Sequence, residues 1–306
     1  MKVCVFGAGG LGGLFGGFLA ADGADVSFIA RGAHLKAMQE QGLRVQSPLG
    51  DRHVANTKAF EDPAEVGPVD LLLVCVKSYG LEAAADQFEP LLKPDTAIVP
   101  VLNGVEAPGY LGERFGGHRV TAGIAHVPSN IDAPGLVVHK SPRIGLIVGA
   151  LEGRAGEVID WLVDAGCRTG MDVTLSQTIE LDLWRKFILW AASSGVTSIS
   201  RRPIGAAQEI PELQALLKGL MEETYAVARA RGVPLPDDSV EKVLKTLNAA
   251  PAGMKSSTLV DLEAGNRLEI DVGVGAVMRM SEQLGLDAPI ARTAYAALKP
   301  WQNGAG

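Results

Sequence analysis

Short apolar runs alternate with segments of helical periodicity through the first half of the chain. The runs are rich in valine, leucine, isoleucine and phenylalanine, as buried strands usually are. Alternation of this kind is typical of βαβ units around a parallel sheet. We expect strands at 2–6, 25–30, 69–76, 97–102 and 168–173, helices near 10–22, 33–41, 79–88 and 154–165, and a hairpin around a turn at 47–51.

Residues 118–150 follow a different pattern. They contain short strand-like pieces and three prolines, Pro128, Pro134 and Pro142, with little helical periodicity. We expect antiparallel strands at the edge of the sheet here, because proline is tolerated at sheet edges.

From about residue 175 onward the periodicity is helical to the end of the chain. Thr174 and Gln177 match a capping box, which predicts the start of a long helix that contains Lys186. The expected organisation is an α/β domain of residues 1–172 followed by an all-helical domain of residues 173–306.

Composition excludes several classes of protein. The chain has 306 residues, of which 47% are hydrophobic and 21% charged, as in globular proteins with a sizeable core. Its net charge of −7 argues against nucleic-acid binding. Cys4, Cys75 and Cys167 lack the spacing of a metal site, so we expect core thiols and no metal.

The uncharged stretch 3–21 could be mistaken for a membrane segment. Seven of its residues are glycines in a regular pattern, which favours a different role. We expect no membrane association and a cytoplasmic location.

A glycine motif follows the first expected strand and opens the first helix. That context is typical of dinucleotide-binding sites, in which the first glycine allows a tight turn, the second admits a pyrophosphate, and the third packs helix on strand. The sheet is therefore expected to be of the Rossmann type, although a structural turn would also fit. The motif consists of Gly7, Ala8, Gly9, Gly10, Leu11 and Gly12.

The second strand indicates which dinucleotide binds. An NAD site needs an acidic residue at the end of this strand, but Asp25 comes at its start and Arg31 follows its end. A guanidinium suits a 2′-phosphate. We expect NADPH as the cofactor, with a solvated loop arginine as the alternative.

Two further polar residues follow later strands of the expected sheet. Lys77 comes after the run at 69–76, and Asn103 ends the run at 97–102. Ligands of open α/β sheets bind at this edge, so both are candidate cofactor contacts, and Asn103 is also a candidate for the substrate. A surface lysine and an Asn-Gly turn remain open as alternatives.

Lys186 lies in an apolar helix and shares a face with Asp182 and Trp190. Burial lowers the pKa of a lysine toward neutrality, which suits a general acid. A surface ion pair between Asp182 and Lys186 would also fit the spacing.

The segment 256–271 holds two more candidates. Glu269 is expected to open a helix and to share a face with Gly273, where a glycine would allow close approach of another group. Ser257 is the second candidate. A helix-dipole role for Glu269 and a capping role for Ser257 are the alternatives.

Together these motifs resemble the ketopantoate reductase (2-dehydropantoate 2-reductase) family over nearly the whole chain. They are the glycine pattern with its further Gly16, then Arg31, Lys77, Asn103-Gly104, Trp184-x-Lys186, Ser257-x-x-x-Asp261 and Glu269-Ile-Asp271.

The resemblance implies an NADP-dependent oxidoreductase that reduces ketopantoate to pantoate in pantothenate biosynthesis. In that scheme NADPH supplies a hydride, Lys186 supplies the proton, and Glu269 and Ser257 hold the substrate, with Asn103 supporting the lysine. The implied partner is a small 2-oxo acid.

The sequence departs from the family at the substrate pocket. The family usually places asparagines four and eight residues after the lysine and three before the serine, whereas this chain has Trp190, Ser194 and Met254. Trp190 and Ser194 are still expected to line the pocket, but lost hydrogen-bond groups change substrate preference strongly. A related 2-oxo acid or carbonyl reductase and a non-catalytic NADP(H)-binding regulator remain alternatives, and the sequence leaves a homodimer open.

Overall fold

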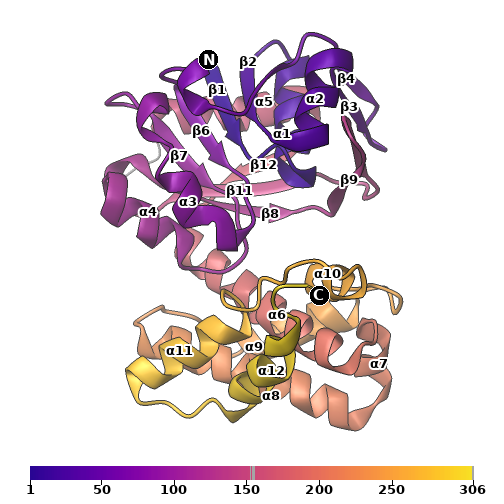
Figure 1. Ribbon diagram of the computed structural model, residues 1–306. Helices are drawn as coiled ribbons and strands as arrows, with labels where there is room; N and C mark the ends of the chain where they lie inside the picture. Colours follow the sequence, from indigo (N-terminus) through magenta and orange to yellow (C-terminus); the bar gives the residue numbers. More distant parts are fainter. Residues whose placement is uncertain (152, 154–155, 305–306) are drawn as a thin grey trace. The chain divides into compact units, whose positions relative to one another are not determined.

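The computed structural model describes residues 1–151, 153 and 156–304. The chain forms two compact units (Figure 1). The first contains Met1–Leu102 and Ala107–Ile179, and the second contains Asn103–Glu106 and Glu180–Gly306. The short segment Asn103–Glu106 thus leaves the first unit and returns to it, and it carries Asn103 into the second unit.

The first unit is built around a five-stranded parallel sheet, in agreement with the predicted fold class. Its strand order is β5-β2-β1-β6-β7. In the centre, Val5 of β1 pairs with Phe28 on one side and Leu73 on the other. The strands are β1 (Lys2–Phe6), β2 (Asp25–Ile29), β5 (Lys58–Phe60), β6 (Leu71–Val74) and β7 (Ala97–Pro100).

Helices join the strands of this sheet. The helix expected at 79–88 is shorter than predicted, and residues 154 and 155, at the start of another expected helix, lie outside the described residues. The α-helices are α1 (Gly10–Ala21), α2 (Gly32–Gln41), α3 (Leu81–Ala85), α4 (Ala107–Phe115) and α5 (Glu157–Thr169), with short 3-10 turns η1 (Pro63–Glu65), η2 (Ser78–Gly80), η3 (Glu89–Leu91) and η4 (Gly117–Arg119).

Two smaller sheets complete the first unit. The predicted antiparallel pairing is present between β8 and β11 and between β9 and β10, but these pairs belong to two separate sheets. One sheet has the order β4-β3-β10-β9 and includes the predicted hairpin of β3 and β4; the other has the order β12-β11-β8. Their strands are β3 (Leu43–Gln46), β4 (Arg52–Val54), β8 (Thr121–His126), β9 (Ser129–Ala133), β10 (Leu136–His139), β11 (Gly145–Ala150) and β12 (Asp172–Leu175).

The predicted capping box is wrong. Thr174 lies in β12 and pairs with Ile147 of β11, so backbone pairing in a sheet overrides the local capping signal. The expected boundary after residue 172 falls within this strand, whereas the two compact units divide after Ile179.

Helix α1 packs between the parallel sheet and the smaller sheet that contains β3 and β10. On one side a Cβ atom at Gly16 would lie 2.4 Å from Phe28. On the other side, Cβ atoms at Gly13 and Gly17 would lie 2.8 Å from Val137 and 2.7 Å from Val45. Glycine is therefore needed on both faces of α1, because no larger side chain fits between the helix and either sheet.

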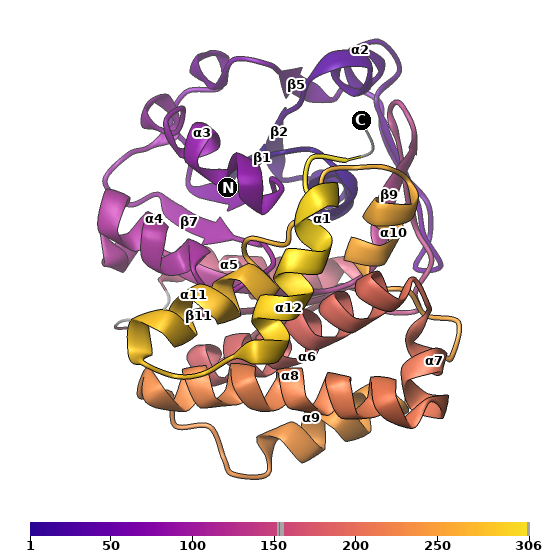
Figure 2. The same ribbon diagram turned by 60° about the horizontal axis from the view of Figure 1, so that its bottom comes forward.

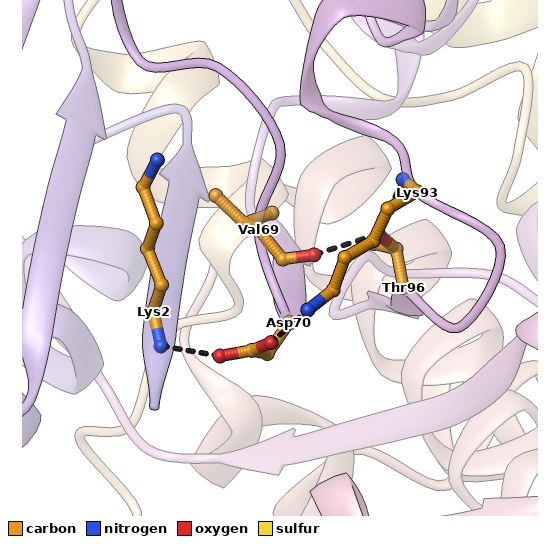
Figure 3. A network of polar contacts seen from close by, with 5 residues as sticks. All are labelled: Lys2, Val69, Asp70, Lys93 and Thr96. Atoms are coloured by element: carbon orange, nitrogen blue, oxygen red, sulfur yellow. Dashed lines mark hydrogen bonds and ion pairs between the residues drawn. The ribbon is translucent and has the colours of Figure 1, made fainter.

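A polar network joins the amino-terminal ends of β1, β6 and β7 (Figure 3). The Asp70 carboxylate accepts a 2.7 Å hydrogen bond from the backbone N–H of Lys2 and pairs with the Lys93 ammonium. The Thr96 hydroxyl donates to the carbonyl of Val69 at 2.7 Å. These contacts lower the pKa of Asp70, with the Lys2 backbone hydrogen bond as the largest cause.

The second unit is helical, as predicted. Helices α7, α9, α11 and α12 all contact α8 (Figure 2). Its helices are α6 (Ile179–Ser200, whose first residue belongs to the first unit), α7 (Ile204–Glu209), α8 (Pro211–Ala230), α9 (Ser239–Asn248), α10 (Ser257–Glu263), α11 (Val274–Leu284), α12 (Pro289–Leu298) and a final turn η5 (Lys299–Trp301).

No helix among the described residues is long and apolar enough to cross a membrane. The described part of the chain also contains no group of three histidine, cysteine or acidic side chains that could hold a metal ion. Of the three cysteines expected in the core, Cys4 is buried and Cys75 is partly buried, but Cys167 on α5 is exposed.

Candidate active site

The glycine motif forms the turn between β1 and α1. The backbone N–H groups of Gly7 and Ala8 both donate to the carbonyl of Ile29, at 3.1 and 3.0 Å. Gly7 has a φ of +97°, a conformation that favours glycine. A Cβ at Gly12 would lie 2.2 Å from the carbonyl oxygen of Gly7, so this position must also be glycine for the helix to pack on the turn.

Gly9 is the N-cap residue of α1 and is the open position of the motif. A Cβ built on it meets nothing within 4 Å, and the first turn of α1 carries no acidic side chain. An anion can therefore approach the free N–H groups and the positive end of the helix dipole. By contrast, a Cβ at Gly10 would lie 2.5 Å from the Ser129 carbonyl, so packing against β9 already accounts for this glycine. Leu11, the remaining candidate, is partly buried.

Arg31 is exposed at the end of β2, where it precedes α2. The backbone N–H of Ala30 donates to the Phe60 carbonyl at 3.0 Å, so the end of β5 lies beside the end of β2. A shallow pocket at this edge is lined by Arg31, Glu61, Asp62, Pro63, Glu65 and Gln87. The carboxylates of this pocket follow β5, and the sequence pattern did not reveal that β5 lies beside β2. The Asp62 carboxylate accepts a 2.9 Å hydrogen bond from the backbone N–H of Ala64.

Lys77 is exposed and follows β6, at the carboxyl end of the sheet. Just before it, the backbone of Cys75 supports the glycine turn, because a Cβ at Gly7 would lie 3.0 Å from it. Burial raises the pKa of the Cys75 thiol to about 12, so this cysteine is an unreactive packing group.

Lys186 lies on α6 in the second unit and is partly buried. Burial lowers the pKa of its ammonium to about 8, and the Glu269 carboxylate opposes this shift. The nearby Asp182 carboxylate lies 3.5 Å from the Arg185 guanidinium.

Glu269, which influences the pKa of Lys186, is hydrogen-bonded to Asn103. The Glu269 side chain is only 7% exposed, and Asn103 Nδ2 donates to its Oε2 at 3.3 Å. The expectation that Glu269 opens a helix is wrong, because α11 begins at Val274 and Glu269 lies in the irregular segment before it. A lysine of lowered pKa, a buried carboxylate and an amide therefore gather in one unit.

The two departures from the family pattern lie along α6 from Lys186. Trp190 and Ser194 are buried, and neither the indole Nε1 nor the serine Oγ has a hydrogen-bond partner among the described residues. Ser198, one turn further along α6, is also buried, and its Oγ has no hydrogen-bond partner among the described residues. Such buried and unpaired donors are costly unless a ligand or water accepts from them.

Gly273 explains how the helical unit accommodates Trp190. A Cβ at Gly273 would lie 3.3 Å from the six-membered ring of the indole, so the close approach expected at this glycine is that of Trp190. Gly273 lies just before α11 instead of within a helix, which removes the expected helical cost.

Ser257 is the first residue of α10. The preceding residue, Ser256, caps this helix. The Ser256 Oγ accepts a 3.1 Å hydrogen bond from the Leu259 N–H and lies 2.7 Å from the Thr197 hydroxyl of α6. Ser257 is thus placed next to a contact between α10 and α6. Met254, at the third departure from the family pattern, is 39% exposed.

Comparison with known proteins identifies the family. Residues 3–153 match the model for ketopantoate reductase PanE/ApbA, and residues 178–302 match the model for its C-terminal domain. The chain belongs to the ketopantoate reductase family.

Individual members of the ketopantoate reductase family align along the whole chain. The uncharacterized oxidoreductase YkpB of Bacillus subtilis is 30% identical over 99% of both chains, and a 2-dehydropantoate 2-reductase of Mesorhizobium japonicum is 30% identical over 94% of both. The crystal structure of a PanE/ApbA family ketopantoate reductase from Ralstonia eutropha is 32% identical, with a TM-score of 0.89 over 99% of this chain and 98% of that one. The protein is an oxidoreductase of the 2-dehydropantoate 2-reductase type, and the family uses a nicotinamide cofactor.

The same fold also serves another substrate. A D-mandelate dehydrogenase crystallised with NADH and anilino(oxo)acetate has a TM-score of 0.89 at 20% identity, which shows a shared fold alone. Membership of the ketopantoate reductase family therefore leaves the substrate to be argued from the residues of the site.

Sequence reasoning missed residues that support the site. Arg279 on α11 pairs with Glu106, which lies in the same short segment as Asn103, and no local motif marks either residue. The carboxylates of Glu61 and Glu65 near Arg31 depend on strand order, which a sequence pattern does not give.

Proposed function

We propose that this chain reduces a 2-oxo acid with NADPH, and that 2-dehydropantoate is the first substrate to test. The observation that carries the proposal is the lowered pKa of Lys186, about 8, beside a buried carboxylate that is itself held by an amide. A lysine with this pKa is protonated in most molecules at pH 7 and can still give up its proton, which suits a general acid.

The proposed chemistry divides between the cofactor and the chain. NADPH supplies the hydride to the C2 carbonyl carbon. The Lys186 ammonium donates a hydrogen bond to the carbonyl oxygen, stabilises negative charge as the C–O π bond breaks, and transfers its proton to the alkoxide. The products would be the 2-hydroxy acid, NADP⁺ and a neutral lysine, which regains a proton from solvent. Glu269 favours the charged form of Lys186 and accepts a hydrogen bond from the substrate hydroxyl.

The remaining contacts to the substrate come from α6 and α10. Trp190 and Ser194 are buried with unpaired donors, and in this proposal a polar group of the substrate accepts from them. Ser257 contributes a hydroxyl from the start of α10. Because an indole N–H can only donate and fills the space of a larger group, a 2-oxo acid other than 2-dehydropantoate is the second candidate.

The described residues fit the dinucleotide. The open space at Gly9, together with the free N–H groups at the start of α1, suits the pyrophosphate. Arg31 would hold the 2′-phosphate, and Lys77 lies at the same edge of the sheet. The carboxylates that share the pocket of Arg31 oppose a phosphate, so the preference for NADPH over NADH is expected to be moderate.

Three wider proposals accompany this function. We place the reaction in pantothenate biosynthesis in the cytoplasm, and we retain a homodimer as the assembly to test by light scattering.

A non-catalytic NADP(H)-binding regulator is the competing function. Lys186, Glu269 and Asn103 would have no use in such a protein, although NADP(H) would bind to it in the same way.

The deciding experiment is NADPH oxidation by purified protein with 2-dehydropantoate and a panel of aliphatic and aromatic 2-oxo acids. Turnover of 2-dehydropantoate above all others supports the leading proposal, and preference for another acid supports the second candidate. NADPH binding without turnover of any acid would support the regulator. Repeating the assay with NADH and with Arg31→Ala tests the cofactor, since loss of a 2′-phosphate contact should raise the KM for NADPH at least tenfold and leave that for NADH nearly unchanged.

A further inference from the structure

Asn103 and Glu269 lie in two segments that have no regular secondary structure. The segments are 103–106 and 266–273, and they are more than 150 positions apart in the sequence, as the hydrogen bond from Asn103 to Glu269 spans 166 residues. Neither a helix nor a sheet fixes their relative position. Something else must hold both side chains in place for the group around Lys186 to keep its geometry.

One guanidinium contacts both segments. Arg279, on α11, donates from Nη1 to the carbonyl oxygen of Asp271 at 2.7 Å. Its Nη2 donates to the Glu106 carboxylate, at 2.9 Å to Oε2 and 3.3 Å to Oε1. Arg279 therefore connects the residue two positions after Glu269 with the residue three positions after Asn103.

The backbones of the two segments also touch between these contacts. Gly104 has a φ of +89°, and a Cβ there would lie 3.1 Å from the carbonyl oxygen of Val272. The segments are thus joined at one end by Asn103 and Glu269, in the middle by Gly104, and at the other end by Arg279.

The far side of this arrangement is anchored to α12 and to the turn that follows it. The Asp271 carboxylate accepts a 2.8 Å hydrogen bond from the Tyr295 hydroxyl and another from Gln302, and the Lys299 ammonium lies 3.6 Å from it. Because Asp271 is fixed by these groups, its carbonyl presents a rigid acceptor to Arg279. The guanidinium then transmits this rigidity to Glu106.

We propose that Arg279 is a positioning residue that aligns Asn103 with Glu269 and thereby holds the Glu269 carboxylate near Lys186. This inference rests on the proposed function for the roles of Lys186 and Glu269. Arg279 and Glu106 are 41% and 43% exposed, so their ion pair contributes little to global stability. Its contribution lies in the geometry of the reacting groups.

Lys186 and Arg279 are surrounded by different charged groups. Lys186 faces Glu269 and has Asp182 and Arg185 on its own helix, whereas Arg279 faces Glu106 and the Asp271 group with Lys299. A change at Arg279 therefore acts on Lys186 through the position of Glu269. Since Glu269 raises the pKa of Lys186, displacing it should lower that pKa further.

The test compares Arg279→Met, Arg279→Lys and Glu106→Gln in the full-length protein. The matched control is Arg292→Met, because Arg292 in the same unit is 52% exposed and lies 3.5 Å from Asp287, outside the group described above. We expect Arg279→Met to lower kcat about 10- to 100-fold with a much smaller change in KM for the oxo acid. The alkaline limb of the pH profile should move to lower pH, and Arg279→Lys should restore part of the loss.

A second readout needs no turnover. Acylation of Lys186 by a small amine-reactive reagent, followed by mass spectrometry across a pH series, reports the fraction of neutral lysine. Arg279→Met should make Lys186 reactive at lower pH than in the wild type, and Arg292→Met should not. Unchanged reactivity and unchanged kcat in Arg279→Met, or equal changes in both variants, would overturn the proposal. If the wild type reduces no oxo acid, the proposed function fails, and the acylation series still decides whether Arg279 positions Glu269.

Discussion

Two lysine–carboxylate groups, Lys93 with Asp70 and Lys186 with Glu269, differ in almost every physical respect. At the amino-terminal ends of the sheet strands, Lys93 and Asp70 are 42% and 27% exposed, and hydrogen bonds lower the pKa of the Asp70 carboxyl (Figure 3). In the helical unit, Glu269 is buried and Lys186 is partly buried, and burial lowers the pKa of the lysine. Pairing alone therefore does not distinguish a structural group from a reactive one.

Hydrogen bonding at Asp70 and burial at Lys186 explain the difference. Asp70 receives hydrogen bonds from a backbone N–H and an ammonium, so its charged form is stabilised and it remains ionised. Burial opposes the charge of Lys186 more strongly than Glu269 supports it, so that charge is held at a cost. The first arrangement joins strands, whereas the second would keep a proton available in the proposed reaction.

The largest difference is expected when each lysine is replaced by methionine. Lys186→Met should lower kcat by a factor of about 10²–10⁴, because it removes the proposed proton donor and the charge that stabilises the alkoxide. Lys93→Met should leave kcat unchanged. Steady-state assays and circular dichroism on both variants check this, and retained turnover in Lys186→Met would exclude its role as the acid.

The pH dependence of catalysis should follow the same lysine. Lys186 must be protonated to donate, so kcat should fall as the pH rises through its pKa of about 8. A profile of kcat from pH 6 to pH 10 with saturating cofactor tests this. A profile that stays flat until the normal range for an exposed lysine, near 10.4, would show that burial does not set its acidity.

Trp190→Asn changes the surroundings of Lys186 without touching the lysine. It restores the asparagine found in the family pattern, so the ratio of kcat/KM for 2-dehydropantoate to that for the best aromatic oxo acid should rise at least tenfold. This ratio does not depend on how much of the variant is folded. That matters because removing a buried tryptophan costs about 3–5 kcal/mol of stability. An unchanged ratio would mean that Trp190 does not contact the substrate.

The smallest effect is expected at Asp70, and it concerns stability. Its folded pKa is depressed, so its contribution is present above the unfolded value of about 4 and is lost as the pH falls through the folded value. Asp70→Asn should therefore cost about 1 kcal/mol at pH 7 and progressively less below pH 4. Urea unfolding at several pH values measures this, and a constant difference at all pH values would contradict the assignment.

Local patterns predicted the parts of the fold that depend on neighbouring residues. The β1–α1–β2 unit and the long helix of Lys186 follow from short-range periodicity and from the glycine motif. The antiparallel pairing predicted between 118 and 150 is present, but these strands belong to two smaller sheets, because strand order depends on contacts that are distant in sequence. The capping role predicted for Thr174 is wrong for the same reason, since its pairing with Ile147 decides its conformation.

The same limit applies to the candidate site: local motifs identify some of its residues, but not those defined by contacts between distant segments. Lys186, Glu269 and Asn103 were singled out from motifs, and the structure places all three in the helical unit. Arg279 could not be found, because an arginine on an amphipathic helix is ordinary until its two partners are known. The contact between Trp190 and Gly273 likewise joins residues that no local rule relates.

The glycines of α1 have a consequence for the order in which the protein folds. Five of its twelve residues are glycine, and each costs about 1 kcal/mol relative to alanine in an isolated helix. The helix therefore cannot persist alone and gains its stability only when the sheets on both sides are present. We expect its amides to acquire protection from hydrogen exchange after those of β1 and β2. The dinucleotide would then meet a binding loop that exists only once the surrounding sheets have assembled, so the unfinished chain could not capture it.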